Sequence, residues 1–399
     1  GVFRSIMTLC GTFVGAMTFL VYTAFVFTFG VSAIWIFIGY WLGFIIFIPF
    51  ALHLKDYSEG KRFYTIIDYF NSKFGKRIAL MVVAVIFIWY FGTLSAQFIG
   101  GGKVLSELTG MNYSVSAVVM CAVIIAYLIL GGFKSVVATD VFQFGVLGII
   151  LIIAAVSIKS GIQVPVSHFN PFNAGPVNII AFLILGILTP FATQDYWQKI
   201  FAMRDRNVVK KSFAISGFLV LILSFFLTYI GLVARTYYQE IDPDLAILYS
   251  FTRLIPPALV GFVAVAFFAA ILSTADTFLF LLSVNFTNDF MDFKDNESAK
   301  VKATRFAIVS IGVLALGLAL IFPKIVDVAI IFKAVGLIVS PIVLYVWLSR
   351  GNSRAIAATL VITFIIVMGL SASGFVRPEL IFVSLIGGAL VYALAALTD

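Results

Sequence analysis

One apolar stretch of the chain, FFAAILSTADTFLFLL at residues 267–282, has a polar centre. Its oxygen-bearing side chains are Ser273, Thr274, Asp276 and Thr277. At about 100° per residue, a helix places Ala270, Ser273, Thr274 and Thr277 on one stripe, with Asp276 about 60° to one side of Ser273. Ser273 could therefore serve two adjacent groups of oxygen ligands.

These two groups suit a hard cation, which prefers oxygen ligands. One group combines the Ala270 carbonyl with the Ser273 and Thr274 hydroxyls, and the other combines Ser273 with Asp276 and Thr277. Alternatively, the hydroxyls only bond back to the preceding helical turn. Asp276 favours the cation, because a carboxylate at the centre of a membrane span costs at least about 2.5–3.5 kcal/mol and normally marks a partner or an ion path.

A second polar group lies in LILGGFKSVVATDVFQFGVLG, residues 128–148. Two glycines follow an apolar run, Thr139 and Asp140 enter the next run, and Gln143 comes three residues later. Asp140 is thus a candidate for a transport-site carboxylate. The residue types equally allow a tight turn followed by an N-capping aspartate.

A third stretch, TLCGTFVGAMTFLVYTAFVFTFG at residues 8–30, contains glycines in the middle of an apolar run. Gly11 and Gly15 loosen a helix there, and broken helices in transporters expose carbonyl groups that bind cations. The alternative is close packing between helices through small residues.

The composition is that of a membrane protein. Of the 399 residues, 62% are hydrophobic and 11% are charged, whereas a soluble domain averages about 45–50% and about 25%. Apolar runs of at least about 18 residues recur along the chain, each long enough to cross a bilayer as a helix. We therefore predict an all-α polytopic membrane protein with spans at 4–29, 31–53, 78–102, 113–130, 141–160, 176–193, 212–234, 255–286, 304–322, 325–348, 354–372 and 378–397.

Other classes of function fit the residues poorly. The net charge of +8 could suggest nucleic acid, but the basic residues are scattered among short loops, and a positive-inside bias with a cytoplasmic start explains them. No nucleophilic triad or phosphate-cradling glycine loop is evident, His53 and His168 are far apart in sequence, and Cys10 and Cys121 lie in predicted spans. We therefore expect no nucleic-acid partner and no enzyme, and place the chain in the cytoplasmic membrane with the lipid bilayer as its surroundings.

Four motifs together resemble the solute:sodium symporter family. GGFKSVVATDVFQ is similar to its glycine-pair, Thr-Asp, Gln signature, and AQFIGGGKVLSELTG (96–110) is similar to its third-helix pattern. AAILSTADT resembles its eighth-helix sodium motif, and DYWQKIFAMRD (195–205) resembles its sixth-helix exit. The motifs occur in the family's order, and the resemblance covers nearly the whole chain.

The resemblance implies a LeuT-type fold, in which two five-helix repeats of inverted topology bind solute and ion near the midplane. Residues 1–399 would form a single transmembrane transporter domain. Repeat one would be residues 4–160 and repeat two residues 176–348, with two additional C-terminal helices at 354–397. Family members usually begin with one further helix, which is missing here, and the chain opens at Gly1 rather than Met. We expect a fragment or a processed chain.

The resemblance also implies sodium sites, carried over by position. The first would use the backbone carbonyls of Gly11, Val14 and Ala270 with the hydroxyls of Ser273 and Thr274. A possible second sodium would use Asp140, Ser273, Asp276 and Thr277. Asp276 departs from the family pattern, because members with two sodiums usually have a hydroxyl there. Its negative charge could tighten the site or hold a proton.

In the family, the first helix lines the solute pocket just past the sodium carbonyls. The corresponding residues here are Phe13, Gly15 and Thr18. Helices 2, 3, 6 and 10 also contribute. Gln97, in the third-helix motif, is a further pocket candidate. Gln194 and Asp195 are candidates for the pocket or for an inner gate.

Lys333, in IIFKAVGLIVSP, falls at or beside a position where sugar-transporting members carry a polar pocket residue. A buried ammonium group needs a partner or loses its proton. We hypothesise that Lys333 meets an anionic group of the solute, such as a carboxylate. The alternatives are that Lys333 pairs with Asp276 or Asp140, or that it snorkels to one face of the membrane.

The resemblance implies a secondary active symporter that imports a small organic solute with sodium by alternating access. Sugars, amino acids and anionic solutes all fall within the family's range. Coupling requires that sodium bind one conformation better than the other. Two alternatives stay open: a solute sensor that signals through a fused module, and a proton-coupled symporter in which Asp140, Asp276 and Lys333 titrate.

Overall fold

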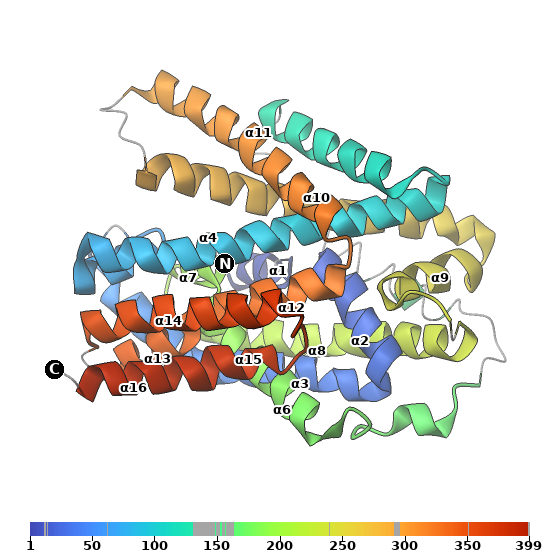
Figure 1. The fold of residues 1–399 in the computed structure, drawn as a ribbon, viewed down its shortest axis with the longest axis horizontal. Helices are drawn as coiled ribbons and strands as arrows, with labels where there is room; N and C mark the ends of the chain where they lie inside the picture. Colours follow the sequence, from blue (N-terminus) through green and yellow to red (C-terminus); the bar gives the residue numbers. More distant parts are fainter. Residues whose placement is uncertain are drawn as a thin grey trace.

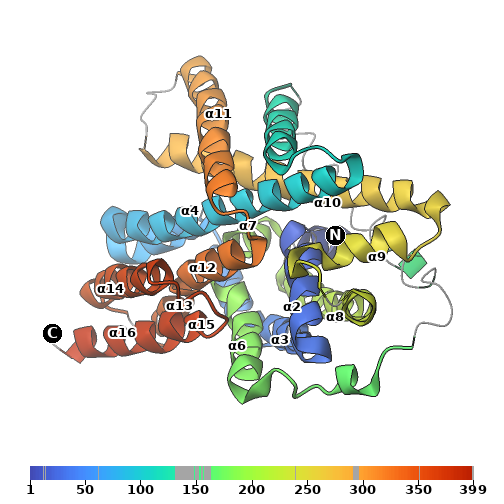
Figure 2. The same ribbon diagram turned by 45° about the vertical axis from the view of Figure 1, so that its right-hand side comes forward.

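The computed structural model describes residues 1–11, 13, 15–61, 63–130, 148, 152, 153, 156, 163–238, 240–290, 296–349 and 351–397. These residues form helices and turns, with no strand among them. Figure 1 shows the long helices running side by side along the long axis of the molecule, and Figure 2 shows α11 and the helix Tyr113–Leu130 together at one edge, next to α10. Within this described part, ten helices are long and apolar enough to cross a membrane.

The first predicted span, 4–29, is not one continuous helix. α1 (Val2–Gly11) ends at the first glycine, and the chain resumes as the π-helical turn η1 (Met17–Val21) and then α2 (Tyr22–Phe29). The 3-10 turn η2 (Gly30–Ile34) leads directly into α3 (Trp35–Tyr57). This interruption agrees with the loosened helix that the sequence predicted at Gly11 and Gly15, inside an apolar run that is itself continuous.

The third-helix motif lies in α4 (Ile66–Thr109), a 44-residue element that changes direction at Gly75, where φ is 78°. Asp68 accepts a hydrogen bond from the backbone N–H of Thr65 at 2.8 Å and closes a capping box at its start. The helix Tyr113–Leu130 follows, as predicted. Asp140 and most of the predicted span 141–160 lie outside the described residues.

The first helix of the predicted second repeat is also broken. After η3 (Val166–Phe169), α6 (Gly175–Ala192) ends at Thr193, whose ψ of 105° is extended, and α7 (Gln194–Ala202) follows at once. Asp205 then caps α8 (Arg206–Tyr237) by accepting a hydrogen bond from the Val208 N–H at 2.9 Å. That hydrogen bond lowers the pKa of the Asp205 carboxyl.

The remaining helices complete the bundle. They are η4 (Pro243–Leu245), α9 (Ala246–Arg253), α10 (Pro257–Phe290), α11 (Glu297–Ile321), α12 (Ile325–Leu337), α13 (Val339–Leu348), α14 (Ser353–Ala372), α15 (Leu380–Phe382), η5 (Val383–Gly387) and α16 (Gly388–Leu397). α10 contains 34 residues, which agrees with the unusual length of the predicted span 255–286. The repeat boundaries remain predictions.

Glycines bring α3 and α6 into backbone contact. A Cβ atom added at Gly39 would lie 2.5 Å from the carbonyl oxygen of Leu183, and one added at Gly43 would lie 2.7 Å from the carbonyl oxygen of Gly186. Both obstacles are backbone atoms, which cannot rotate away. Close approach of this kind is how membrane helices gain packing energy without a hydrophobic driving force between them.

We expect Gly43→Ala to destabilise the purified protein by about 1–3 kcal/mol, because the added methyl overpacks a rigid interface. Gly317→Ala, inside α11, is the matched control, since no atom of another described element lies within 4 Å of its added Cβ. Thermal unfolding in detergent measures the difference. An unfolding temperature for Gly43→Ala at or above that of Gly317→Ala contradicts the packing argument.

Candidate functional site

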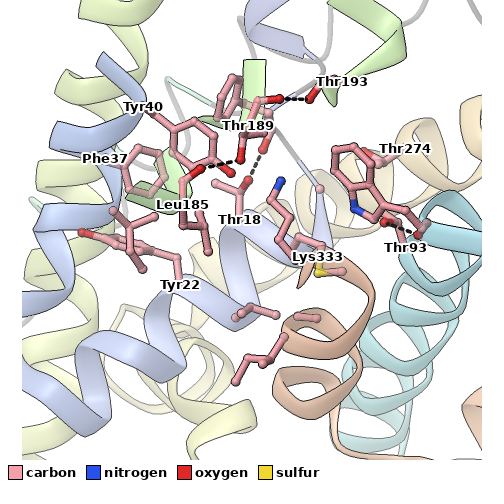
Figure 3. A pocket seen from close by; sticks show the side chains of 18 of the residues that line it. Thr18, Tyr22, Phe37, Tyr40, Thr93, Leu185, Thr189, Thr193, Thr274 and Lys333 are labelled. Atoms are coloured by element: carbon pink, nitrogen blue, oxygen red, sulfur yellow. Dashed lines mark hydrogen bonds between the residues drawn. The ribbon is translucent and has the colours of Figure 1, made fainter. Parts of the chain in front are cut away.

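The two helix breaks line one cavity of about 180 Å³. Walls from α3, α4, α10 and α12 complete it (Figure 3). All five residues that the sequence assigned to the solute pocket lie in this lining: Phe13, Gly15, Thr18, Gln97 and Lys333. The structure therefore gathers residues from three separate sequence regions around a single space.

Sequence reasoning missed most of the aromatic wall. Trp89 and Thr93 line the cavity together with Gln97, and these three residues follow one another at four-residue intervals along one face of α4. That stripe was the available signal. Tyr40 and Phe278, on α3 and α10, also line the cavity, but they carry no comparable pattern, because aromatic residues are common throughout these spans.

The threonine hydroxyls of the cavity are satisfied by nearby carbonyl groups. Thr18 donates to the Phe13 carbonyl across the first break. The others donate to the carbonyl oxygen four residues earlier: Thr93 to Trp89 at 3.0 Å, Thr189 to Leu185 at 2.6 Å, Thr193 to Thr189 at 2.8 Å and Thr274 to Ala270 at 3.0 Å. A solute entering the cavity meets hydroxyl protons that are already engaged.

Lys333 reaches the cavity without an ion pair to any carboxylate of the described residues, which do not include Asp140. Its Nζ lies 4.7 Å from the ring centroid of Trp89 and 5.8 Å from that of Tyr40, in cation–π contact. Figure 3 shows the amine directed into the cavity, with Thr18 on one side and Thr93 on the other. Within the described part of the chain, no carboxylate oxygen lies within 4.0 Å of Nζ. The ion pair with Asp276 considered from the sequence is therefore absent.

Aromatic rings form the floor of the cavity on the side of α1. The ring of Phe13 packs edge-on against Tyr40, with centroids 4.8 Å apart, and lies 5.5 Å from Phe44 and 6.3 Å from Tyr196. Phe25 and Pro378, which lie in the predicted outer halves of their spans, also line the cavity.

Asp195 and Gln194 occupy different surroundings. Asp195, in the first turn of α7, lines the cavity and accepts a hydrogen bond from the Tyr90 hydroxyl at 3.3 Å. The Tyr90 oxygen in turn accepts from the Asp195 backbone N–H at 3.3 Å. Gln194 is completely buried and does not line the cavity. Asp195 is thus placed as a pocket residue, and Gln194 is not.

The first helix break touches α10 at the polar stretch of the sequence. A Cβ atom added at Gly15 would lie 2.6 Å from Thr274 Oγ1, so there is no room for a methyl group between them. Ala270, whose carbonyl accepts from Thr274, is buried beside them. The back-bonded hydroxyl retains lone pairs that can coordinate a cation.

The other predicted sodium ligands are placed in part. Gly11 ends α1, and Ser273 and Asp276 are buried on α10. Thr277 Oγ1 donates to Asp276 Oδ1 at 3.4 Å, so these two side chains share one face. Val14 and Asp140 lie outside the described residues. A second cation site that depends on Asp140 stays a prediction.

Comparisons with known proteins identify the family of this chain. The model of the "Sodium:solute symporter family" matches residues 1–362. A sodium/proline symporter of Staphylococcus aureus is 26% identical over 309 residues, which cover 71% of this chain and 60% of the relative. The chain thus spans about 60% of the length of the curated relatives it matches.

Two solved structures share the fold. One is a Na⁺-coupled sialic acid symporter in a substrate-bound outward-open state, with a TM-score of 0.77 and 18% identity over 100% of this chain and 90% of the other. The second is a nucleobase-cation-symport-1 family transporter in a closed conformation, with a TM-score of 0.61 and 15% identity over 100% of this chain and 92% of the other. The all-helical LeuT-type fold expected from the sequence is confirmed.

We expect a cysteine at position 93, in the cavity wall, to react with a small methanethiosulfonate reagent about tenfold faster or more than one at position 95, because reactivity requires access. Thr93→Cys lines the cavity, whereas Ser95→Cys lies two residues away on α4, completely buried and outside the lining. Cys10 and Cys121 are buried and should not react. Intact-mass spectrometry of both variants gives the rates, and equal rates contradict the assigned cavity.

Proposed function

Because the chain belongs to the sodium:solute symporter family, we propose that it imports a small organic solute together with sodium by alternating access. The family consists of transporters rather than enzymes, and the chain is a multi-pass protein of the cell membrane. The observation that carries the proposal is the contact between Gly15, at the break in the first helix, and Thr274 of α10, at the wall of the cavity.

That contact gives sodium a way to act on the solute site. A cation held by the carbonyls of Gly11 and Val14 and by the oxygens of Ala270, Ser273 and Thr274 would bind the break to α10. The break also lines the cavity, through Phe13, Gly15 and Thr18. Sodium would therefore favour the conformation with a formed cavity, and a preference for one conformation is the requirement for coupling. A second sodium would use Asp140, Ser273, Asp276 and Thr277.

For the solute we propose a small molecule that carries a carboxylate. The threonine hydroxyls of the cavity already donate to carbonyls, whereas two of its donors remain for a ligand: the Lys333 ammonium and the amide nitrogen Nε2 of Gln97, which has no hydrogen-bond partner among the described residues. A carboxylate supplies the matching acceptor and charge. Proline and sialic acid, the solutes named for two of the similar proteins, both carry one.

Reconstitution into proteoliposomes tests the proposal directly. Radiolabelled L-proline, N-acetylneuraminate and small monocarboxylates are screened under an inward sodium gradient and under a matched choline gradient. We expect uptake of at least one carboxylate only with sodium. Uptake that ignores sodium and follows a pH gradient would replace sodium by a proton. Binding without uptake of any solute would favour a sensor.

Thr274→Val removes one proposed sodium ligand and keeps the shape of the side chain. We expect the half-saturating sodium concentration for uptake to rise about tenfold or more, which corresponds to about 1.4 kcal/mol of binding free energy. Thr359→Val on α14 is the control, because Thr359 is also buried and back-bonded, to Ala355 at 2.7 Å, but lies outside the cavity lining. Equal sodium requirements in the two variants would refute the assignment of Thr274.

Lys333→Gln removes the proposed partner of the solute carboxylate. A hydrogen bond to a charged group is worth about 1.5–3 kcal/mol, so we expect the solute concentration at half-maximal uptake to rise by about ten- to a hundredfold. Lys333→Arg keeps the charge and should lose less. The hypothesis is wrong if Lys333→Gln transports every tested solute with the affinity of the parent protein.

A further inference from the structure

Gln97 joins α4 to the broken first helix through one buried hydrogen bond. Its side-chain oxygen Oε1 accepts from the backbone N–H of Ala16 at 2.9 Å, across 81 residues of sequence. Ala16 immediately precedes η1. The first N–H groups of a helix have no partner within it, so Gln97 supplies from another helix the acceptor that the break has removed.

The same bond fixes which way the Gln97 amide faces. A backbone N–H can only donate, so the amide oxygen must face Ala16 and the amino group must face away from it. Gln97 is completely buried and lines the cavity, and its Nε2 has no hydrogen-bond partner in the described part of the structure. A buried donor without an acceptor is unfavourable until a ligand or water supplies one.

The surroundings of Ala16 leave little room for another arrangement. A Cβ atom added at Gly100, on α4 close to Gln97, would lie 2.8 Å from the Ala16 Cβ. On the other side of the break, Gly15 abuts Thr274 in the same way. The backbone between Gly15 and Ala16 is therefore held between α4 and α10, and the Gln97 bond sets its orientation.

We propose that Gln97 is the positioning residue of the cation site. Its oxygen holds the backbone N–H of Ala16, directly after the segment that carries the proposed sodium carbonyls, and its amino group stays available to an acceptor on the solute. A solute bound in the cavity would then act on the same side chain that orders the break. This inference rests on the proposed sodium coupling.

Three variants of Gln97, with one control, separate the parts of this side chain. Gln97→Leu removes the acceptor, and Gln97→Asn keeps the amide but is shorter by one methylene group. Gln97→Glu keeps an acceptor at the original length. Ser95→Ala is the matched control, because Ser95 is equally buried on α4 but lies outside the cavity lining.

The readout is amide hydrogen exchange of peptides that cover residues 8–22, measured in detergent during a titration of NaCl against KCl. In KCl alone, we expect exchange about tenfold faster in Gln97→Leu and Gln97→Asn than in the parent, because a backbone N–H has lost its acceptor. We expect the sodium concentration that gives half-maximal protection to rise about tenfold in both. Gln97→Glu and Ser95→Ala should stay within about threefold of the parent.

Every other outcome contradicts one stated part of the inference. Parent-like exchange in both Gln97→Leu and Gln97→Asn overturns the positioning role. Faster exchange with an unchanged sodium midpoint overturns the link to sodium. A parent protein that shows no sodium response refutes the proposed sodium coupling together with that link, while the comparison in KCl still decides whether Gln97 orders the break. If Gln97→Leu does not fold, Gln97→Asn and Gln97→Glu provide the same comparison.

Discussion

The contact between Gly15 and Thr274 is the constraint on which the rest of the site depends. A helix that breaks inside a bilayer exposes backbone groups that lipid cannot satisfy, so such a break persists only where protein or a lined cavity receives them. Here the Ala16 N–H goes to Gln97 and the Phe13 carbonyl receives the Thr18 hydroxyl. The break is thus stabilised by the same surroundings that bring it against α10.

α4 is the element that connects both breaks. Gln97 binds the backbone just after the first break, and Tyr90 exchanges hydrogen bonds with Asp195 just after the second. Trp89 and Thr93, on the same helix, form part of the cavity wall. One face of α4 therefore contacts the ends of both interrupted helices and the cavity between them. A ligand in this cavity would lie against α4.

The polar groups of the cavity differ in whether their hydrogen-bonding capacity is already used. Its threonine hydroxyls are engaged with carbonyls, whereas Lys333 and the Gln97 amino group retain unused donor capacity within the described residues. Cation–π contacts with Trp89 and Tyr40 hold the ammonium group without neutralising it. The proposal of an anionic solute rests on this arrangement, since a neutral occupant would leave the charge of the ammonium uncompensated.

The sequence by itself determined the class of protein, the family and the polar stretches, because long apolar runs and the order of the motifs do not depend on tertiary contacts. It also indicated Phe13, Gly15, Thr18, Gln97 and Lys333 as pocket residues, all of which line the cavity. Gly11 and Gly15 also indicated a loosened first helix, but the sequence did not show where its two parts end and begin, because hydropathy does not change at a break inside an apolar run. Only the tertiary structure decided that Tyr40 and Phe278 form walls, that Lys333 has no ion pair within the described residues, and which end of the Gln97 amide faces Ala16. Around Tyr40 and Phe278 the residues that face lipid and those that face the cavity are both apolar or aromatic, so the helical period cannot tell the two sides apart, and packing decides.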